Sequence, residues 1–266
     1  MEKWNLNKLK KQANGNQASD EEILKLSNIL KYKNLKVLDV GCSNGYKTNL
    51  LFNKYKNISH IIGIDNDEFA IKSANLDFIN DKRYHFVNCD INAFNSNYKF
   101  DIIYLSYVLQ HLENPISVLK RLRTLLSDKG VIIVKVPDDS FKVCYPDDEN
   151  LLERIFNLYE NNVLKASELT KFTDRYIGKK TYNFLKVAGF SNITLKHIIT
   201  DTIGKNKEEK IDLFNTSIAF RSAANRNNVD ENIKKELEYL LNKLKLKFED
   251  ENFYYSMTVL YFIVKK

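Results

Sequence analysis

The sequence has few cysteines and no long apolar segment. Three cysteines, Cys42, Cys89 and Cys144, are present among 266 residues. Their number is odd and their spacing matches no metal-binding pattern, so neither a disulfide framework nor a metal site is expected, and reduced thiols are the simplest interpretation. No run of roughly 18 apolar residues occurs, and no apolar stretch follows a basic N-terminus. These absences predict a cytoplasmic protein without a membrane span, a secretory signal or a bound metal.

Repeats and low-complexity segments are also absent, whereas hydrophobic residues make up 44% of the chain. This content can fill a full core, and the length predicts one domain over residues 1–266 that carries insertions. The formal charge is +7. Because the lysines are spread rather than clustered, we interpret this charge as a solvated lysine-rich surface and do not expect a nucleic-acid partner.

One stretch, residues 36–45 (KVLDVGCSNG), predicts a ligand-binding turn. Val37, Leu38 and Val40 are typical of a short buried strand, Gly41 and Gly45 follow it, and residues 46–55 have a helical pattern. A strand, a glycine turn and a helix bring the backbone close to a ligand and direct free N–H groups at it.

A carboxylate is placed to serve the same ligand. Asp65 ends a second apolar segment, residues 61–65, and lies twenty residues after Gly45. This spacing suits an acidic side chain that accepts hydrogen bonds from ribose hydroxyls.

Strand and helix patterns alternate through most of the chain. Alternation with right-handed crossovers predicts an α/β fold with a doubly wound parallel sheet. Ligands then bind beyond the carboxyl ends of the strands, where Gly41, Asp65, Asp90 and Ser106 fall. Residues 1–33 are predicted to be helical with a break at residues 14–16, and Ser19 to Glu22 resemble a capping box that starts a helix through Leu30. The predicted strands are residues 36–40, 61–65, 84–88, 101–106, 130–136, 192–199 and 253–264, and the main predicted helices are residues 46–55, 67–80, 115–126 and 174–189.

In the same order, the motifs resemble those of the class I S-adenosylmethionine-dependent methyltransferases. Their first motif, acidic-x-Gly-x-Gly-x-Gly, stands here as DVGCSNG at residues 39–45, with Ser43 in place of the middle glycine. The resemblance covers roughly residues 35–140 and continues through four further motifs, which are GIDN at 63–66, NCDI at 88–91, FDIIYLS at 100–106 and GVIIVKV at 130–136.

The resemblance implies the rest of the architecture. It implies a Rossmann-like sheet of seven strands, mostly parallel, whose last strand is antiparallel and lies between the fifth and the sixth. Residues 35–137 would form the cofactor-binding core, and residues 1–34 a helical lid with Trp4, Gln12 and Asn14 as lid residues. For Trp4 an anchor that packs the first helix onto the core is the favoured alternative. Two segments, residues 138–174 and 205–250, would be insertions that cover the substrate.

It also implies which residues hold S-adenosylmethionine. Asp65 and Asn66 would bind the ribose, and Gly41, Ser43 and Gly45 would leave room for the amino acid tail. Asp39 would hold the tail's ammonium group, directly or through water, or would instead stabilise the turn. Asp90 and Ile91 would hold the adenine, unless Asp90 caps the turn at Asn92. Ser106 would line the same site.

Two residues are candidates for catalysis. His111 is the single histidine after the fourth strand and could act as a general base, although histidines here are often structural in the family. Tyr107 could assist catalysis or shape the pocket with Ser106.

An acidic loop suggests a substrate class. Asp138 and Asp139 begin a segment rich in carboxylates, which would attract a protonated amine; an ordinary solvated loop is the alternative. We therefore expect methyl transfer to nitrogen or oxygen of a small molecule, with an amine favoured. Two alternatives stay open, an RNA-modifying methyltransferase and a non-catalytic partner subunit that binds the cofactor. The RNA enzyme is disfavoured because the Asn/Asp-Pro-Pro-Tyr motif of many base methylases is missing.

Overall fold

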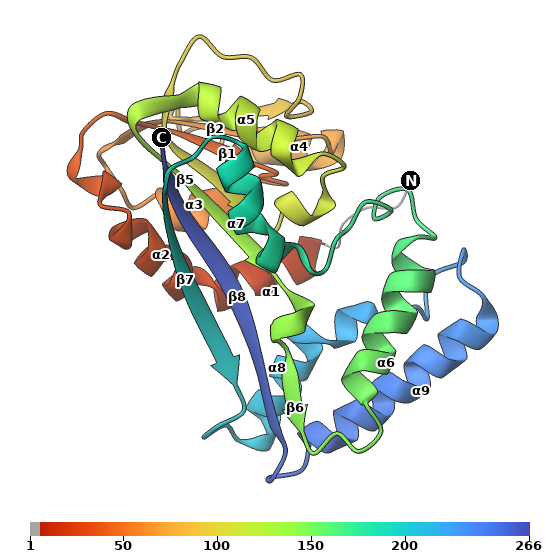
Figure 1. Cartoon of the computed structure of the whole chain (residues 1–266). Coiled ribbons are helices and arrows are strands. Elements are labelled where there is room, and N and C mark those ends of the chain that lie inside the picture. The colour runs from red at the N-terminus through yellow and green to blue at the C-terminus, as the bar shows by residue number, and fades with distance from the viewer. Residues whose placement is uncertain (1–5) are drawn as a thin grey trace. The chain divides into compact units, whose positions relative to one another are not determined.

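The structure of the protein, a computed structural model, describes residues 6–266, which form two compact units (Figure 1). Unit 1 comprises residues 6–136, 178–196 and 260–266, and unit 2 comprises residues 137–177 and 197–259. Unit 2 contains both segments that the sequence marks as insertions. Trp4 lies outside the described residues.

Unit 1 is built on a parallel sheet. The strands β1 (Leu35–Val40), β2 (Ile58–Asp65), β3 (Tyr84–Asn88), β4 (Phe100–Ser106) and β5 (Leu126–Pro137) pair in the order β3-β2-β1-β4-β5, all in parallel. The central strands β1 and β4 are buried along nearly their whole length. Burial on both faces explains why most of their residues are apolar.

The C-terminal strand closes the sheet in the predicted way. The strand β8 (Tyr254–Lys265) lies between β5 and β7 (Asn192–Asp201), and it runs antiparallel to β7 (Figure 1). The doubly wound α/β fold with an antiparallel last strand is therefore confirmed. In the described chain the sheet has eight strands rather than seven, because the short strand β6 (Val143–Tyr145) also pairs with β8, in antiparallel fashion.

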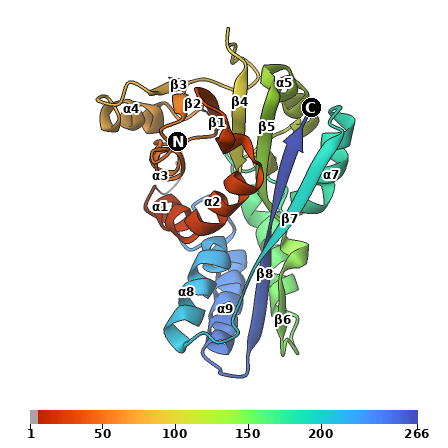
Figure 2. The same ribbon diagram turned by 90° about the vertical axis from the view of Figure 1, so that its left-hand side faces the viewer.

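Helices cover both faces of this sheet. One face carries α1 (Leu6–Gly15), α2 (Gln17–Leu26) and α3 (Tyr46–Phe52), and the other carries α5 (Pro115–Leu125) and α7 (Ile177–Val187) (Figure 2). A further helix, α4 (Glu68–Asp77), packs against β2 and β3. Its start is fixed by the Asp67 side chain, which accepts hydrogen bonds from the N–H groups of Phe69 and Ala70.

The predicted capping box at Ser19 to Glu22 is wrong. The helix α2 already begins at Gln17 and ends at Leu26, so Asp20 lies inside the helix, with only 3% of its surface exposed. Its carboxylate serves a different purpose, described below.

Unit 2 is mainly helical. It contains α6 (Leu151–Leu158), which continues as a π-helix over Tyr159–Leu164, as well as α8 (Lys207–Ser217) and α9 (Glu231–Phe248). Leucines at helical spacing on α9 are buried against α6 and α8, which gives unit 2 its own apolar core. No helix in residues 6–266 has the length and apolar character needed to cross a membrane.

Candidate active site

The turn after β1 has an unusual backbone. Gly41, Ser43 and Gly45 have φ angles of 71°, 50° and 73°, all in the left-handed region. The turn is held against the end of β2, because the N–H groups of Gly41 and Cys42 donate to the carbonyl of Ile64 at 2.8 and 3.1 Å. The predicted strand–turn–helix arrangement is therefore present.

The two glycines are also required by packing. A Cβ atom on Gly41 would lie 2.4 Å from Cγ2 of Val108, and one on Gly45 would lie 2.5 Å from Cζ of Phe86. A side chain at either position would therefore strain the fold itself, in addition to any effect on a ligand. If a branched residue at Gly41 weakened cofactor binding, damage to the fold could therefore explain the loss as well as a clash with the cofactor.

Asp65 supports the same turn. Its Oδ2 accepts from the N–H of Ser43 at 2.8 Å and its Oδ1 from the N–H of Asp67 at 2.9 Å. Burial raises the pKa of Asp65, and the nearby charge of Asp67 acts in the same direction, while the backbone N–H groups oppose both. The carboxylate thus sits at the carboxyl end of β2, where the sequence places it, with the exposed Asn66 next to it.

Asp39 is almost fully enclosed. It is 3% exposed, and its Oδ2 accepts a hydrogen bond of 2.6 Å from the hydroxyl of Thr48 on α3. Burial raises the pKa of Asp39 to about 7, against the opposing effects of the Thr48 hydroxyl and of the Lys47 charge. Asp39 therefore fits the interpretation as a turn-stabilising carboxylate. Because its pKa lies near neutral pH, a nearby positive charge would shift it toward the ionised form.

The structure places Asp90 and Ile91 after β3. The Oδ1 atom of Asp90 accepts from the N–H of Asn92 at 2.6 Å, so Asp90 caps this turn, as the alternative interpretation proposed. The Asp90 side chain is exposed and Ile91 is 6% exposed. One carboxylate can accept several hydrogen bonds, so the cap does not prevent a second role.

The end of β4 and the turn after it carry buried polar atoms without partners. Within residues 6–266, Oγ of Ser106 and Oε1 of Gln110 are buried and have no hydrogen-bond partner. The Gln110 amide nitrogen lies 2.9 Å from Nε2 of His111, which must then act as the acceptor. Orphaned polar atoms at the carboxyl end of a parallel strand are typical of a place that receives a polar ligand.

Of the predicted lid residues, Asn14 and Gln12 lie within the described chain. The Asn14 side chain accepts a hydrogen bond of 2.8 Å from the Tyr46 hydroxyl, at the start of α3. Gln12 is exposed. The N-terminal helices are thus linked to the first helix after the glycine turn.

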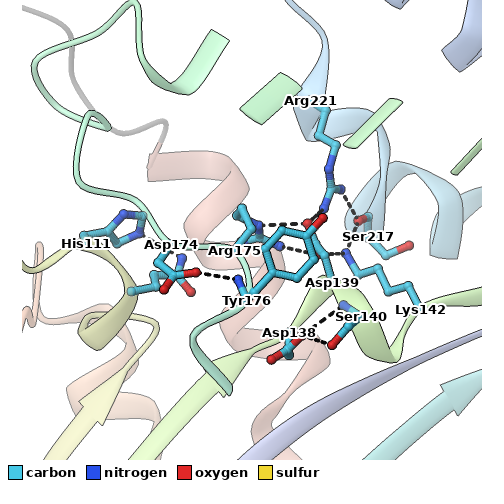
Figure 3. Close-up of polar contacts among 11 residues, drawn as sticks. His111, Asp138, Asp139, Ser140, Lys142, Asp174, Arg175, Tyr176, Ser217 and Arg221 are labelled. Atoms are coloured by element: carbon cyan, nitrogen blue, oxygen red, sulfur yellow. Dashed lines mark hydrogen bonds and ion pairs between the residues drawn. The ribbon is translucent and has the colours of Figure 1, made fainter. Parts of the chain in front are cut away.

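The first two carboxylates of the acidic loop are buried and already have donors. Asp139 is 4% exposed and binds Arg175 at 2.9 Å, Lys142 at 3.0 Å and Arg221 at 2.5 Å (Figure 3). Burial alone would raise the pKa of Asp139, but these three cations hold it well below its usual range. Asp138 is fully buried and accepts from the N–H and the hydroxyl of Ser140 (Figure 3).

Both carboxylates already have donors within unit 2, which weighs against a role of Asp138 and Asp139 in attracting a cationic substrate; that role stays a prediction. Two further carboxylates of the acidic loop are also engaged. Asp147 accepts from the N–H of Leu151 at 2.7 Å, and Glu149 pairs with Lys243 at 2.6 Å.

The sequence did not lead us to predict one buried ion pair of unit 1. Lys135 and Asp20 form a buried ion pair of 3.1 Å at 0% and 2% side-chain exposure. A signal for Lys135 existed, since it is the one charged residue within the apolar segment GVIIVKV. No local signal marked Asp20 as its partner, because 115 positions separate the two residues.

Comparison with known proteins identifies the family. The methyltransferase domain family matches residues 31–189, more than half of the chain. The tRNA U34 carboxymethyltransferase of Aliarcobacter butzleri is 28% identical over 201 residues, which cover 70% of this chain and 57% of that protein. The trans-aconitate 2-methyltransferase of an Enterobacter species is 29% identical over 103 residues, 39% of each chain. The chain thus spans about half the length of these curated relatives or less.

A solved structure shows the same fold. The YcgJ protein of Bacillus subtilis superposes with a TM-score of 0.59 at 12% identity, over 94% of this chain and 99% of that one. The predicted family is confirmed by the domain match together with this fold. The chain belongs to the methyltransferase domain family.

Proposed function

We propose that the cofactor binds at the carboxyl ends of β1, β2 and β4. The observation that carries this proposal is the arrangement around the left-handed turn, where Asp65 lies on one side and the orphaned Ser106 and Gln110 atoms follow β4. These groups match a ligand with ribose hydroxyls and a charged amino acid tail, so the residues fit S-adenosylmethionine.

Each residue has a proposed role toward the cofactor. Asp65, with Asn66, accepts from the ribose hydroxyls, and the Gly41, Ser43 and Gly45 turn accommodates the tail. Asp39 faces the tail's ammonium group, and Asp90 with Ile91 holds the adenine. When bound, the cofactor supplies an electrophilic methyl group, so the protein mainly has to align a nucleophile and accept a proton where one is present.

His111 and Tyr107 are the proposed residues on the acceptor side. The His111 Nε2 atom accepts from Gln110. As proton acceptor toward a substrate, His111 would first have to exchange this contact for the acceptor's N–H or O–H. Turnover that rises with pH through the histidine range, and loses this dependence in His111→Gln, would support the role.

We further propose that the methyl acceptor is a small acid. In unit 2, three cations share the single carboxylate of Asp139, and two of them, Lys142 and Arg221, also donate to the carbonyl of Ser217 at 3.0 and 2.9 Å (Figure 3). Burial lowers the pKa of Lys142 well below its usual value, and repulsion by Arg221 lowers it further. A second anion near this cluster would relieve that repulsion.

A buried donor supports the same proposal. Within the described residues, Nε of Arg221 has no hydrogen-bond partner although the side chain is fully buried. Leaving a guanidinium donor unpaired in the interior is unfavourable. An acceptor carboxylate or phosphate would satisfy it, as Arg does in bidentate pairs. Of the two relatives, the Enterobacter protein is named for an acid, trans-aconitate, and the Aliarcobacter protein for tRNA.

RNA is the second candidate acceptor. It is favoured by the relative named for tRNA. Binding to RNA through phosphates would weaken steeply with salt, because counterions are released. Retention on heparin with a strong salt dependence would favour RNA, whereas salt-independent turnover of a small acid would exclude it as the main substrate.

The decisive experiment follows radiolabelled methyl from the cofactor into a panel of carboxylic acids, phosphate esters, amines and tRNA. We expect transfer to an acid, and Arg175→Gln should raise the acceptor's KM about tenfold or more while the cofactor's Kd is preserved. Arg154→Gln is the matched control, since Arg154 is a half-exposed arginine of unit 2, 3.6 Å from Glu236. Preferred transfer to amines, or an Arg175→Gln enzyme with unchanged KM, would contradict the proposal of an acidic acceptor.

A further inference from the structure

A buried carboxylate joins the N-terminal helices to the sheet. Oδ1 of Asp20 accepts from Lys135 Nζ at 3.1 Å and from the hydroxyls of Tyr104 at 2.9 Å and Tyr261 at 2.7 Å. Oδ2 accepts from Lys47 Nζ at 2.7 Å. These partners come from β5, β4, β8 and α3, so one side chain of α2 connects four other elements of unit 1.

This arrangement requires a charged acceptor. Four donors converge on the two carboxylate oxygens, which offer about four lone pairs. An amide in the same place has one acceptor oxygen and presents an N–H group to cations. Burial alone would raise the pKa of Asp20, but the charges of Lys135 and Lys47 lower it below its usual value. Removing one partner of such a buried pair leaves an uncompensated charge in the interior.

Lys135 in turn holds Tyr107. Its Nζ lies 4.9 Å from the centre of the Tyr107 ring, and its carbonyl accepts from the Tyr107 N–H at 2.9 Å. Tyr107 has a φ angle of 58°, in the left-handed region that is unfavourable for a bulky residue. Such a conformation persists only where the surroundings enforce it, and a desolvated cation–π contact is one such constraint.

We propose that Asp20 positions Tyr107 through Lys135, so that docking of α2 completes the acceptor side of the active site. This inference rests on the proposed function only in placing Tyr107 beside the reacting methyl group. The Asp20 carboxylate favours the protonated form of Lys135, and the Lys135 ammonium fixes the Tyr107 ring. The N-terminal helices then contribute to turnover in addition to any contact with the cofactor.

The protonation state of Lys135 is central to this coupling. The groups that face it are the Asp20 carboxylate, the Lys47 ammonium and the Tyr104, Tyr107 and Tyr261 side chains. The Asp20 carboxylate favours the charged form, while burial and Lys47 lower the pKa of Lys135. Removal of the Asp20 charge should therefore bring the deprotonation of Lys135 to a lower pH.

The first test is a double-mutant cycle with Lys135→Met and Tyr107→Leu, followed by kcat and by calorimetric cofactor binding. If Lys135 acts through Tyr107, each change lowers kcat about tenfold or more, the double variant is no worse than the worse single variant, and the cofactor Kd shifts less than about threefold. Multiplying effects would mean that Lys135 acts independently of Tyr107 and would overturn the proposal. Cofactor binding by the native enzyme tests the proposed function separately.

The second test uses the pH profile, which a merely structural role would not move. In Asp20→Asn, the fall of kcat at high pH should shift to lower pH relative to the native enzyme, because the charge that stabilises protonated Lys135 is gone. Asp128→Asn is the control, since Asp128 is fully exposed and lies 3.4 Å from Lys266. An Asp20→Asn profile that coincides with the native one would overturn the proposal, even if Lys135→Met fails to fold.

Discussion

Three buried or half-buried aspartates of unit 1 differ in their tendency to hold a proton. Cations lower the pKa of Asp20, whereas burial raises the pKa of Asp65 and raises that of Asp39 to about 7. The difference follows from their partners, because Asp20 meets two lysines while Asp39 accepts from a neutral hydroxyl. Asp39 is therefore the group whose charge a ligand can change near neutral pH.

Cofactor binding should release a proton from Asp39. At about pH 6 this carboxyl is mostly protonated, and a bound ammonium group would favour its charged form. Calorimetry in two buffers with different ionisation enthalpies should therefore show release of up to about one proton, and none in Asp39→Asn. Equal proton release by both proteins would separate Asp39 from the cofactor's tail.

Asp39 should also make the free protein less stable as pH rises. Its pKa is raised from 3.8 to about 7 in the fold, so the folded state binds more protons than the unfolded state between these values. The free energy of unfolding should fall across this window by about 1.4 kcal/mol for each pH unit. Urea unfolding of Asp39→Asn should lack this component of the decrease, and a parallel pH dependence in both proteins would contradict the assignment.

At the scale of elements, the β1–α3 turn depends on two glycines for its packing. Gly45 packs under the Phe86 ring with a left-handed backbone, so Gly45→Ala meets both a clash and backbone strain. We expect a loss of about 1–3 kcal/mol in the free energy of unfolding. Gly15→Ala is the control, because nothing lies within 4 Å of a Cβ atom there.

Chemical denaturation of the two variants checks this expectation. Gly15→Ala should be neutral or slightly stabilising. A Gly45→Ala protein as stable as the native one would show that Phe86 moves aside without loss, and that the turn tolerates a side chain.

The elements themselves could be predicted well because their signals are local. The apolar residues of β4 and the start of α5 at Pro115 were both predicted from the sequence and are both present in the structure. The three-residue strand β6 was missed, since so short a segment has no periodicity of its own. The acidic pattern at residues 19–22 led to the wrong prediction of a capping box, because the same residue types serve as helix caps and as partners in buried ion pairs.

Only the parts of the candidate site that belong to a sequence motif could be predicted. The turn and Asp65 follow from spacing along the chain, whereas the environment of Asp139 does not. Its partners Arg175 and Arg221 are 36 and 82 positions away, so a loop that looks acidic in sequence is enclosed by cations in the fold. The amine hypothesis was drawn from the sequence without these partners, and it stays a prediction.

At the scale of the whole molecule, each of the two units has its own apolar core. Leu240 on α9 is fully buried in the core of unit 2. Leu240→Ala should reduce the stability of unit 2 by about 2–5 kcal/mol through loss of burial and an unfilled cavity. Hydrogen exchange should then accelerate in α6 and α9 more than in β1 and β4.

Exchange that accelerates equally in both units would show that they unfold as one cooperative body. Tyr239→Ala is the matched control, because Tyr239 is a neighbouring residue of α9 with 57% of its surface exposed. Its exchange pattern should resemble that of the native protein.

The most direct test of the central claim is calorimetric titration of S-adenosylmethionine into the native protein, Asp65→Ala and Asp77→Ala. Asp77 is an exposed aspartate at the end of α4 and serves as the control. We predict that the native protein binds, that Asp77→Ala binds equally well, and that Asp65→Ala loses about 2 kcal/mol, roughly thirtyfold in Kd. Absence of binding by the folded native protein, or undiminished affinity in a folded Asp65→Ala protein, would contradict the placement of the cofactor at this end of the sheet.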